Sequence, residues 1–318
     1  MRDPVPFGRY LLLERIDVGG MAEVFTARVA EGEGAGRLVA VKRLLPTLAE
    51  DPAAVAMFLD EARIAVQLDH PCIARVDDLG QHGAAYYIAM EHVAGRPLKA
   101  LQDALTARGE RLAVPLCALV GVRMLAALEH AHARRDGVGR PLGIVHRDVS
   151  PHNVLLSFEG EVKLIDFGLA HAGERGARQE PGVVRGKTAY LSPEQARGLP
   201  VDARSDVFSA GVVLHELLTG RRLFAASSDL LALENVLEAP VPSPRASRPE
   251  IPEAVAGAVL SALERDPARR PASAAAFLGT LGPFVQEPAA ARELAELMRN
   301  LFPRELAAER ARAAAAET

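Results

Sequence analysis

The stretch HRDVSPHN, residues 146–153, places a histidine, an arginine, an aspartate and an asparagine within eight positions of a 318-residue chain. An apolar run precedes it, and a second dense motif, KLIDFG at 163–168, follows shortly after. A carboxylate can take a proton from a hydroxyl nucleophile, and carboxylate and amide oxygens are ligands that Mg²⁺ accepts. Asp148, Asn153 and Asp166 therefore indicate a catalytic loop.

The predicted secondary structure of the chain changes near residue 92, before this loop. The first ninety residues are mostly strand-like, with one helix expected over about 52–68, where apolar residues recur at helical spacing. The expected strands are 9–16, 23–30, 37–45, 73–80 and 84–91. Residues 93–97 read as a linker.

Beyond the linker the chain is mainly helical, with two short strands around 154–157 and 162–165. The expected helices are about 114–134, 204–219, 229–237, 252–264 and 273–281. This order predicts an α+β, bilobal fold, with a small β-rich lobe followed by a larger helical lobe. Ligand sites commonly form in the cleft between such units.

The bulk composition narrows the class of protein. A net charge of −4 gives no reason to propose nucleic acid as a partner. Cys72 and Cys117 lie far apart and form no ligand pattern, which favours free thiols in a reducing compartment. The N-terminus lacks the apolar core of a signal peptide, and the longest apolar region is interrupted by charges, so we expect a cytoplasmic protein with no membrane span.

Two further motifs lie in the strand-rich part. Small residues at 17–24 (DVGGMAEV) let the backbone approach a phosphate, although a plain hairpin turn also needs glycines. Lys42 ends the strand motif VAVK, and Glu61 lies in the helix that follows. An isolated strand lysine is usually solvated, but pairing with Glu61 would hold the ammonium in place for a phosphate.

Each motif alone is common, but their order is specific: a glycine-containing turn, VAVK, a helix glutamate, HRD with asparagine five residues on, DFG, and Ser192-Pro193-Glu194. In this order they resemble the eukaryotic-like protein kinases, and most closely the bacterial serine/threonine kinases. The resemblance covers about residues 9–282. It implies a small lobe at about 9–91, a hinge at about 91–96, a large lobe at about 97–282 and a helical tail at 283–318.

The resemblance implies a role for each matching residue. Lys42 would contact the α- and β-phosphates of ATP and pair with Glu61, and Asp148 would orient or deprotonate the acceptor hydroxyl. Asn153 and Asp166 would bind Mg²⁺. The remaining nucleotide contacts would come from the glycine turn, the adenine pocket, the gatekeeper position and the hinge: Val18, Gly19, Gly20, Val24, Ala40, Leu155, Met90, Glu91 and Val93.

Three residues match structural positions of the family. Glu194 and Arg270 would form an ion pair beneath the platform that binds the substrate peptide. Asp206 would brace the HRD loop. All three are expected to hold the site and to do no chemistry.

The glycine turn departs from the family pattern at two positions. Asp17 and Ala22 stand where the first and third glycines are usual. Ala22 is benign because it is small. Since a carboxylate is repelled by phosphates, we expect Asp17 to face solvent and at most to weaken ATP affinity.

The catalytic loop also departs from the family. Ser150 stands where serine/threonine kinases usually carry a lysine that meets the transferring phosphate, and Lys187 stands where a threonine is usual. In the family these two positions are neighbours in space. We predict that hydroxyl and ammonium have exchanged places, so that Lys187 supplies the missing charge. The alternative is a solvent-facing Lys187 in a weak or inactive enzyme.

The activation segment between Gly168 and Gly186 contains no Ser, Thr or Tyr. In kinases with HRD, the arginine usually holds a phosphorylated residue of this segment. We predict that an acidic residue, Glu180 before Glu174, occupies the Arg147 site, and that activity does not await phosphorylation here. A mobile polar loop is the alternative. Thr188 and Ser192 remain as phosphosites within the substrate platform.

Two segments fall outside these roles. Residues 134–142 are rich in Gly and Pro and predict a surface hairpin, with docking as a less favoured role. In the tail, Leu294, Leu297, Met298 and Leu301 form one apolar stripe, and a second helical segment follows Pro303. Docking back onto the large lobe is favoured over a partner or self-association helix.

The function predicted is an ATP- and Mg²⁺-dependent protein kinase that phosphorylates Ser/Thr of protein substrates in bacterial signalling. A pseudokinase that acts as a nucleotide-binding scaffold is the alternative, supported by Ser150, Asp17 and the missing phosphosite. A kinase of small molecules is disfavoured by Glu194, Asp206 and Arg270, since these residues build a peptide platform.

Overall fold

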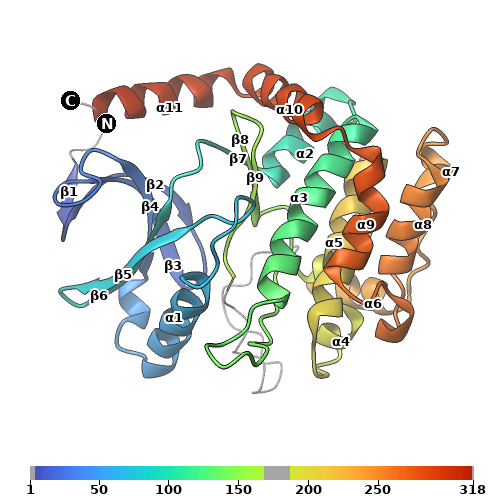
Figure 1. The fold of residues 1–318 in the computed structure, drawn as a ribbon, viewed down its shortest axis with the longest axis horizontal. Helices are drawn as coiled ribbons and strands as arrows, with labels where there is room; N and C mark the ends of the chain where they lie inside the picture. Colours follow the sequence, from blue (N-terminus) through green and yellow to red (C-terminus); the bar gives the residue numbers. More distant parts are fainter. Residues whose placement is uncertain (1–3, 168–186, 317–318) are drawn as a thin grey trace.

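The computed structural model describes residues 4–167 and 187–316, which form two lobes (Figure 1). The small lobe contains a six-stranded antiparallel sheet in the order β1-β2-β3-β4-β6-β5. Its strands are β1 (Val5–Phe7), β2 (Tyr10–Val18), β3 (Ala22–Val29), β4 (Leu38–Leu44), β5 (Val76–His82) and β6 (Ala85–Glu91). The predicted bilobal α+β fold is confirmed.

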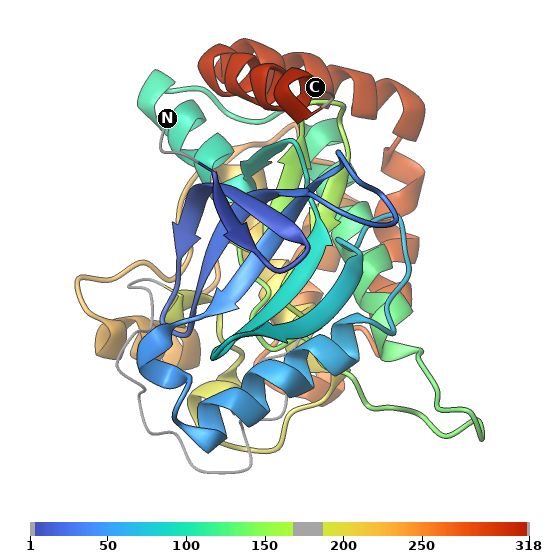
Figure 2. The same cartoon turned by 90° about the vertical axis from the view of Figure 1, so that its left-hand side faces the viewer.

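Helix α1 (Pro52–Ala65) packs against the small-lobe sheet, as both views of the fold show (Figures 1 and 2). Asp51 caps its N-terminus by accepting the Ala53 N–H at 2.9 Å, and Pro52 suits the first helical position. Phe58 and Ala62 are buried against Leu44 of β4 and Ile88 of β6. This packing fixes the rotation of α1 and so turns Glu61 toward the sheet.

The large lobe is built around α3 (Val114–His132) and α5 (Ala203–Thr219), which pack on one another. Among the described residues, α3 is the one helix long and apolar enough to cross a membrane, and 67% of that stretch is buried within the protein. Around this pair lie α2 (Leu98–Arg108), α4 (Pro193–Ala196), α6 (Asp229–Glu238), α7 (Pro244–Ser247), α8 (Glu253–Ala262) and α9 (Ala274–Leu281). Short 3₁₀ turns occur at Pro46–Leu48, Thr188–Tyr190, Pro267–Arg269 and Gly282–Phe284.

A second, three-stranded sheet joins the linker to the catalytic loop. It consists of β7 (Gly95–Pro97), β8 (Val154–Ser157) and β9 (Val162–Leu164). The predicted linker at 93–97 therefore contains a strand, because three of its residues pair with β8. Gly95 has no room for a side chain, since a Cβ there would lie 2.0 Å from the Leu156 carbonyl oxygen.

Sequence analysis also missed α2, although its signal was present. Leu98, Leu101 and Leu105 lie on one buried face, and Gly109 ends the helix in a left-handed conformation with φ of 66°. The helical spacing of its leucines was missed because polar residues lie between them and because the helix directly follows the predicted linker.

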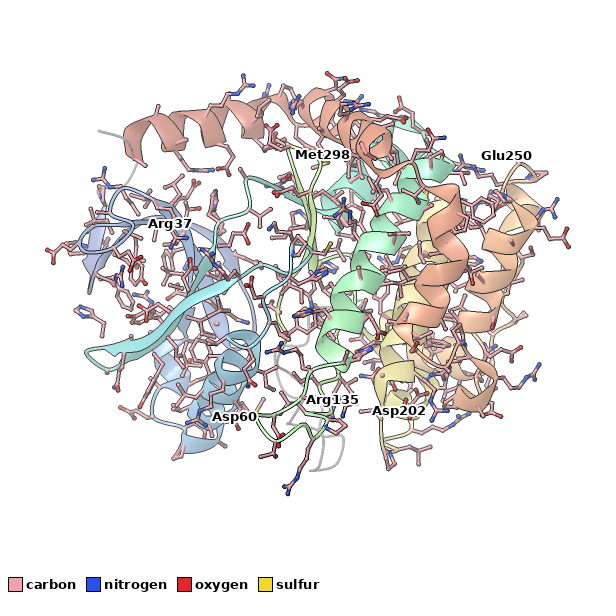
Figure 3. The ribbon with its side chains drawn as sticks, viewed as in Figure 1. Arg37, Asp60, Arg135, Asp202, Glu250 and Met298 are labelled. Carbon is pink, nitrogen blue, oxygen red and sulfur yellow. The ribbon has the colours of Figure 1, made fainter. Side chains whose placement is uncertain are left out.

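The predicted surface hairpin at 134–142 is confirmed. Arg135, labelled in Figure 3, pairs with Pro141 across it. The Asp136 carboxylate accepts the N–H groups of Val138 and Arg140 at 2.9 Å, which closes the turn. The hairpin projects from the molecule beyond the end of α3 (Figure 2).

The tail forms α10 (Glu287–Leu301) and α11 (Pro303–Ala316). The stripe predicted on the first of these helices packs onto the large lobe, with Leu294 and Met298 fully buried. Met298 is labelled in Figure 3. Helix α11 then runs across to the small lobe (Figure 1). Docking onto the large lobe is therefore correct for α10, whereas α11 reaches further than predicted.

Candidate active site

Lys42 on β4 connects three segments that are distant in the sequence. Its ammonium donates to Glu61 Oε1 at 2.5 Å and to Asp166 Oδ1 at 2.9 Å. Glu61 comes from α1, and Asp166 follows β9. Helix α1 is therefore rotated so that Glu61 faces Lys42, and Asp166 of the DFG motif contacts the same ammonium.

Burial and charge act in opposite directions on these three groups. Burial alone would lower the pKa of Lys42, but the carboxylates of Asp166 and Glu61 raise it. Burial also disfavours a charged Asp166, yet Lys42 and then Lys187 lower the pKa of that carboxyl. Burial raises the pKa of Glu61 against the pull of Lys42. The lysine and the DFG aspartate are therefore held charged at neutral pH.

Asp148 and Asn153 are held together within the catalytic loop. The Asn153 side-chain amide donates to the Asp148 backbone oxygen and to its Oδ2, both at 2.8 Å. Because both amide hydrogens are used, the Asn153 side-chain oxygen is the atom left for a metal. The second carboxylate oxygen of Asp148, Oδ1, has no hydrogen-bond partner within 4–167 and 187–316, so it is open to an acceptor hydroxyl.

The donor set suits Mg²⁺ better than a transition metal. Asn153 and Asp166 offer hard oxygen ligands, and no cluster of three or more His, Cys, Asp or Glu side chains with metal-binding geometry occurs among the described residues. Mg²⁺ is commonly held by one or two protein carboxylates plus substrate phosphates and water. The residues present fit this ion without further protein ligands.

Lys187 lies at the catalytic carboxylate. Its ammonium donates to Asp148 Oδ2 at 2.6 Å, and its side chain is 24% exposed. This position contradicts the solvent-facing alternative for Lys187. The positive charge that the exchange hypothesis requires is therefore present beside Asp148.

Ser150 contributes differently from the prediction. Its side chain is fully buried, and its hydroxyl forms no hydrogen bond within the part of the chain that the structure describes. It contacts neither the Asp148 carboxylate nor the Lys187 ammonium by hydrogen bonding. The ammonium half of the exchange thus has geometric support, and the hydroxyl half has none.

Asp206 of α5 fixes the backbone of the HRD loop. Its fully buried carboxylate accepts the N–H groups of His146 at 2.7 Å and Arg147 at 2.8 Å, and it bonds His132 at 2.7 Å. Arg147 has φ of 64° and Asp166 has φ of 63°, which are uncommon for residues other than glycine. Asp206 supplies the bonds that hold the first of these strained residues.

The residues expected around adenine line the junction of the lobes. In the sheet, Val24 of β3 pairs with Lys42, and Ala40 of β4 pairs with Met90 of β6. Leu155 lies opposite on β8, half-buried. A cavity behind Met90 is lined by residues of both lobes, including Glu61 and Asp166.

The next residues are those expected to contact the nucleotide from the hinge and the glycine turn. The Glu91 carboxylate is held by Lys163 of β9 at 2.7 Å, and Val93 follows two residues later, half-buried. Val18, Gly19 and Gly20 are exposed, with the turn closed by the Gly19 N–H donating to the Ala22 oxygen at 2.8 Å. Asp17 is also exposed and accepts the Val18 N–H, in keeping with the expected solvent-facing side chain.

The predicted ion pair beneath the substrate platform is formed. Arg270 binds Glu194 through two hydrogen bonds at 2.7 and 2.8 Å, and its side chain is fully buried. Ser205 adds a third bond to the same carboxylate at 2.5 Å. Although burial opposes ionisation, the bonds from Arg270 and Ser205 lower the pKa of Glu194. Its contribution to stability is complete above the ordinary carboxyl pKa and is lost as pH falls through the lowered value.

Arg270→Ala is expected to lower the free energy of unfolding by about 3–5 kcal/mol, because it leaves a buried, uncompensated carboxylate. Arg269→Ala is the matched control, since Arg269 is exposed and bonds Glu264 at the surface. Thermal unfolding of both variants at pH 7 measures the difference. Equal melting temperatures for the two variants would show that the pair does not support the platform.

Sequence analysis missed two residues that hold the catalytic loop. Gln195 donates to the Arg147 backbone oxygen at 2.8 Å, and His146 bonds the Ile165 backbone oxygen at 2.9 Å. The sequence contained a signal for Gln195, because Ser192 and Gln195 form a capping box at the start of α4, which is a recognisable sequence pattern. The role of His146 had no such signal.

The acidic residues proposed for the Arg147 site, Glu174 and Glu180, lie outside the described residues, so that hypothesis stays a prediction. The two remaining hydroxyls of the platform are described. Ser192 is fully buried as the helix cap of α4, and Thr188 donates to Asp229 at 3.0 Å. A buried cap is a poor acceptor for a phosphate.

Comparisons with known proteins match this geometry. The protein kinase domain model matches residues 10–279. The tyrosine-protein kinase MasK of Myxococcus xanthus is 39% identical over 89% of this chain and 44% of its own length. The serine/threonine-protein kinase PrkC of Bacillus subtilis is 39% identical over 83% of this chain and 38% of its own length.

A third relative and a solved structure agree with these matches. The serine/threonine-protein kinase PknA of Mycobacterium tuberculosis is 36% identical over 90% of this chain and 62% of its own length. The crystal structure of the Mycobacterium tuberculosis PknI kinase domain superposes with a TM-score of 0.66 at 26% identity, covering 89% of this chain and 99% of that domain. The chain thus spans less than two thirds of the length of these three curated relatives. It belongs to the protein kinase family, in the group of eukaryotic-like bacterial serine/threonine kinases.

Proposed function

We propose that this chain is an active protein kinase that transfers the γ-phosphate of ATP, with Mg²⁺, to Ser or Thr hydroxyls of protein substrates in bacterial signalling. The observation that carries the proposal is the ammonium of Lys42, bonded at once to Glu61 and Asp166. Family membership and the names of PrkC and PknA support the Ser/Thr acceptor.

Each residue has a task that its contacts allow. Lys42, fixed by Glu61, neutralises phosphate charge, and Asp148 accepts the proton of the acceptor hydroxyl through its open oxygen. Lys187 places a positive charge beside Asp148, where it can stabilise the negative charge of the phosphoryl group during transfer. Asn153 and Asp166 would hold Mg²⁺, which would neutralise part of the negative charge of the phosphates.

The test is one reaction of the chain with radiolabelled ATP, Mg²⁺ and generic acceptor proteins, followed by phosphosite mass spectrometry. Label on Ser and Thr supports the proposal. Label on Tyr alone would favour the acceptor named for MasK and overturn the Ser/Thr assignment. Sites found on the chain itself distinguish self-phosphorylation from transfer to the added proteins.

A pseudokinase is the second candidate, because Ser150 removes the usual catalytic-loop lysine. In that case the chain binds nucleotide and signals by shape, without transfer. Nucleotide binding by calorimetry combined with label incorporation no greater than in Asp148→Asn would establish it. The ammonium of Lys187 at 2.6 Å from Asp148 argues for the active enzyme.

Activity is expected to be unchanged after phosphatase treatment, because residues 169–185 contain no hydroxyl side chain to phosphorylate. The initial rate of peptide phosphorylation before and after treatment measures this. The phosphatase must be removed before the assay, and mass spectrometry confirms loss of any phosphate. A large fall in rate would instead assign regulation to Thr188, the half-buried alternative to fully buried Ser192.

The setting of the reaction is part of the same proposal. Protein substrates are the expected partners, since the Glu194–Arg270 pair supports a peptide platform, and nucleic acid is not expected at a net charge of −4. A cytoplasmic location suits an enzyme that consumes ATP and keeps Cys72 and Cys117 as free thiols. Self-association or partner binding through the tail is the less favoured alternative to its docking on the large lobe, and the mass of the chain in solution tests it.

A further inference from the structure

The two tail helices attach to the protein by different forces. Helix α10 is anchored by apolar burial, with Leu294 and Met298 fully inside the large-lobe core. Arg299 adds bonds to the Phe158 backbone oxygen at 2.8 Å and to Glu159 at 2.7 Å. This helix is therefore an integral part of the large lobe.

Helix α11 leaves α10 at Pro303 and crosses to the small lobe, with its C-terminal end beside the sheet (Figures 1 and 2). Arg312 binds Glu14 of β2 at 2.5 Å, and Arg28 of β3 donates to the Ala315 backbone oxygen at 3.1 Å. The chain thus joins its two lobes twice, once through the hinge and once through this helix.

Between its two ends, α11 also contacts the hinge. His92 Nε2 lies 2.9 Å from Glu309 Oε2, and both side chains are largely buried, at 9% and 14% exposed. Although burial opposes ionisation, His92 and Arg312 lower the pKa of the Glu309 carboxyl, so it is charged at neutral pH. Arg312 bonds the same carboxylate at 2.7 Å, which links the hinge contact to the contact with β2.

His92 occupies the position between the two hinge residues expected to present backbone groups to adenine, Glu91 and Val93. The Glu91 side chain is tied to Lys163 of the large lobe at 2.7 Å. The adjacent side chain is tied to the tail. Glu309 therefore fixes the hinge side chain that directly follows Glu91.

We infer that Glu309 is a positioning residue for nucleotide binding, acting through His92, and that α11 is a strap that sets the geometry of the hinge. This inference rests on the proposed function, because it assigns the strap to the ATP site. Leu306, near the start of α11, packs against the large-lobe core. The contacts of α11 with the hinge and the small lobe are polar, and are made by Glu309, Arg312 and the Ala315 backbone oxygen. Breaking them alters the hinge without opening the core.

Glu309→Ala in the full chain is expected to weaken Mg-ATP binding about three- to tenfold, the effect of losing one hydrogen bond of ordinary net strength. The KM for the acceptor peptide should stay within about twofold, because the peptide platform lies in the large lobe away from the tail. Isothermal calorimetry gives the Kd for Mg-ATP, and initial rates give the two KM values. Glu309→Gln keeps an acceptor oxygen and should recover part of the affinity.

Arg310→Ala is the matched control, since Arg310 is exposed, lies two positions before Arg312 and forms no hydrogen bond or ion pair with either lobe within residues 4–167 and 187–316. It should leave the Kd for Mg-ATP unchanged. A double-mutant cycle of His92→Ala with Glu309→Ala should be non-additive if the two residues act on one another. Thermal melting of each variant confirms that it is folded at the assay temperature.

The outcomes separate this inference from the proposed function. Failure of the wild-type chain to bind Mg-ATP would overturn the proposed function. If the wild-type chain binds Mg-ATP and both Glu309→Ala and Glu309→Gln bind it with the wild-type Kd, the inference alone is overturned. A parallel loss in Arg310→Ala, equal rises in both KM values, or additive effects in the double-mutant cycle would overturn it as well.

Discussion

Asp148→Asn is expected to lower turnover about 10²- to 10⁴-fold, the usual contribution of a positioned general base. Asparagine has nearly the same shape, and its side-chain oxygen can still accept the bond from Asn153 that Asp148 Oδ2 accepts now. It cannot take a proton from the acceptor hydroxyl, nor can it form an ion pair with Lys187. The loss is therefore one of chemistry at the site.

Binding of Mg-ATP should survive this substitution, because Lys42, Glu61 and Asp166 are untouched. Calorimetry measures the Kd, and label transfer from ATP measures the rate. Asp60→Asn, on the exposed face of α1 and paired only with Arg63 in the described structure, is the matched control. A rate for Asp148→Asn within about tenfold of the wild-type chain would remove Asp148 from the role of base.

Lys187→Ala is expected to lower turnover about 10²-fold or more, the usual effect of removing one group that stabilises developing charge. The ammonium lies 2.6 Å from the Asp148 carboxylate, and its charge also helps to lower the pKa of Asp166 after the larger effect of Lys42. Removing it takes away the ammonium bonded to Asp148, and the catalytic loop has no lysine of its own to replace it, since Ser150 stands at the usual position. The fall should appear in kcat at saturating ATP.

A reciprocal variant tests whether the charge alone matters. Lys187→Thr should lose activity like the alanine variant, and adding Ser150→Lys should recover part of it by returning the ammonium to the usual position in the family. Ser150 is fully buried, so the new side chain must use the space that Lys187 leaves. Near-normal turnover of Lys187→Ala would show that Lys187 has no part in catalysis and would overturn the exchange hypothesis.

The kinase fold was readable from the sequence because its motifs are local. Local residue patterns predict the strand that contains Lys42, the helix that contains Glu61, and the HRD and DFG stretches. Shorter or more polar elements were missed: β7 has three residues, and α2 alternates its buried leucines with polar side chains. Such elements are stabilised by partners that lie elsewhere in the chain.

The departures from the family pattern could be seen in the sequence, but their consequences could not. Ser150 and Lys187 were identified as a pair of exceptions. Whether Lys187 reaches Asp148 depends on the path of the segment that brings it back, 39 residues later, to the catalytic loop. The buried hydroxyl of Ser150, without a hydrogen bond in the described structure, shows that only half of the expected exchange is supported.

The tail helices also make contacts that the sequence did not predict. Its apolar stripe predicted a helix packed on the large lobe, because apolar spacing identifies a face that must be buried. Nothing in the spacing of α11 indicates that Glu309 meets His92, 217 residues earlier.

Periodicity and motif order are properties of the chain, so they were enough to identify the family, the bilobal fold and the residue types of the catalytic loop. The charges that meet could be identified only after folding: Lys187 with Asp148, Lys163 with Glu91, and Glu309 with His92. The physical reason is that an ion pair depends on the distance between two atoms, which the packing of whole elements sets and sequence separation does not.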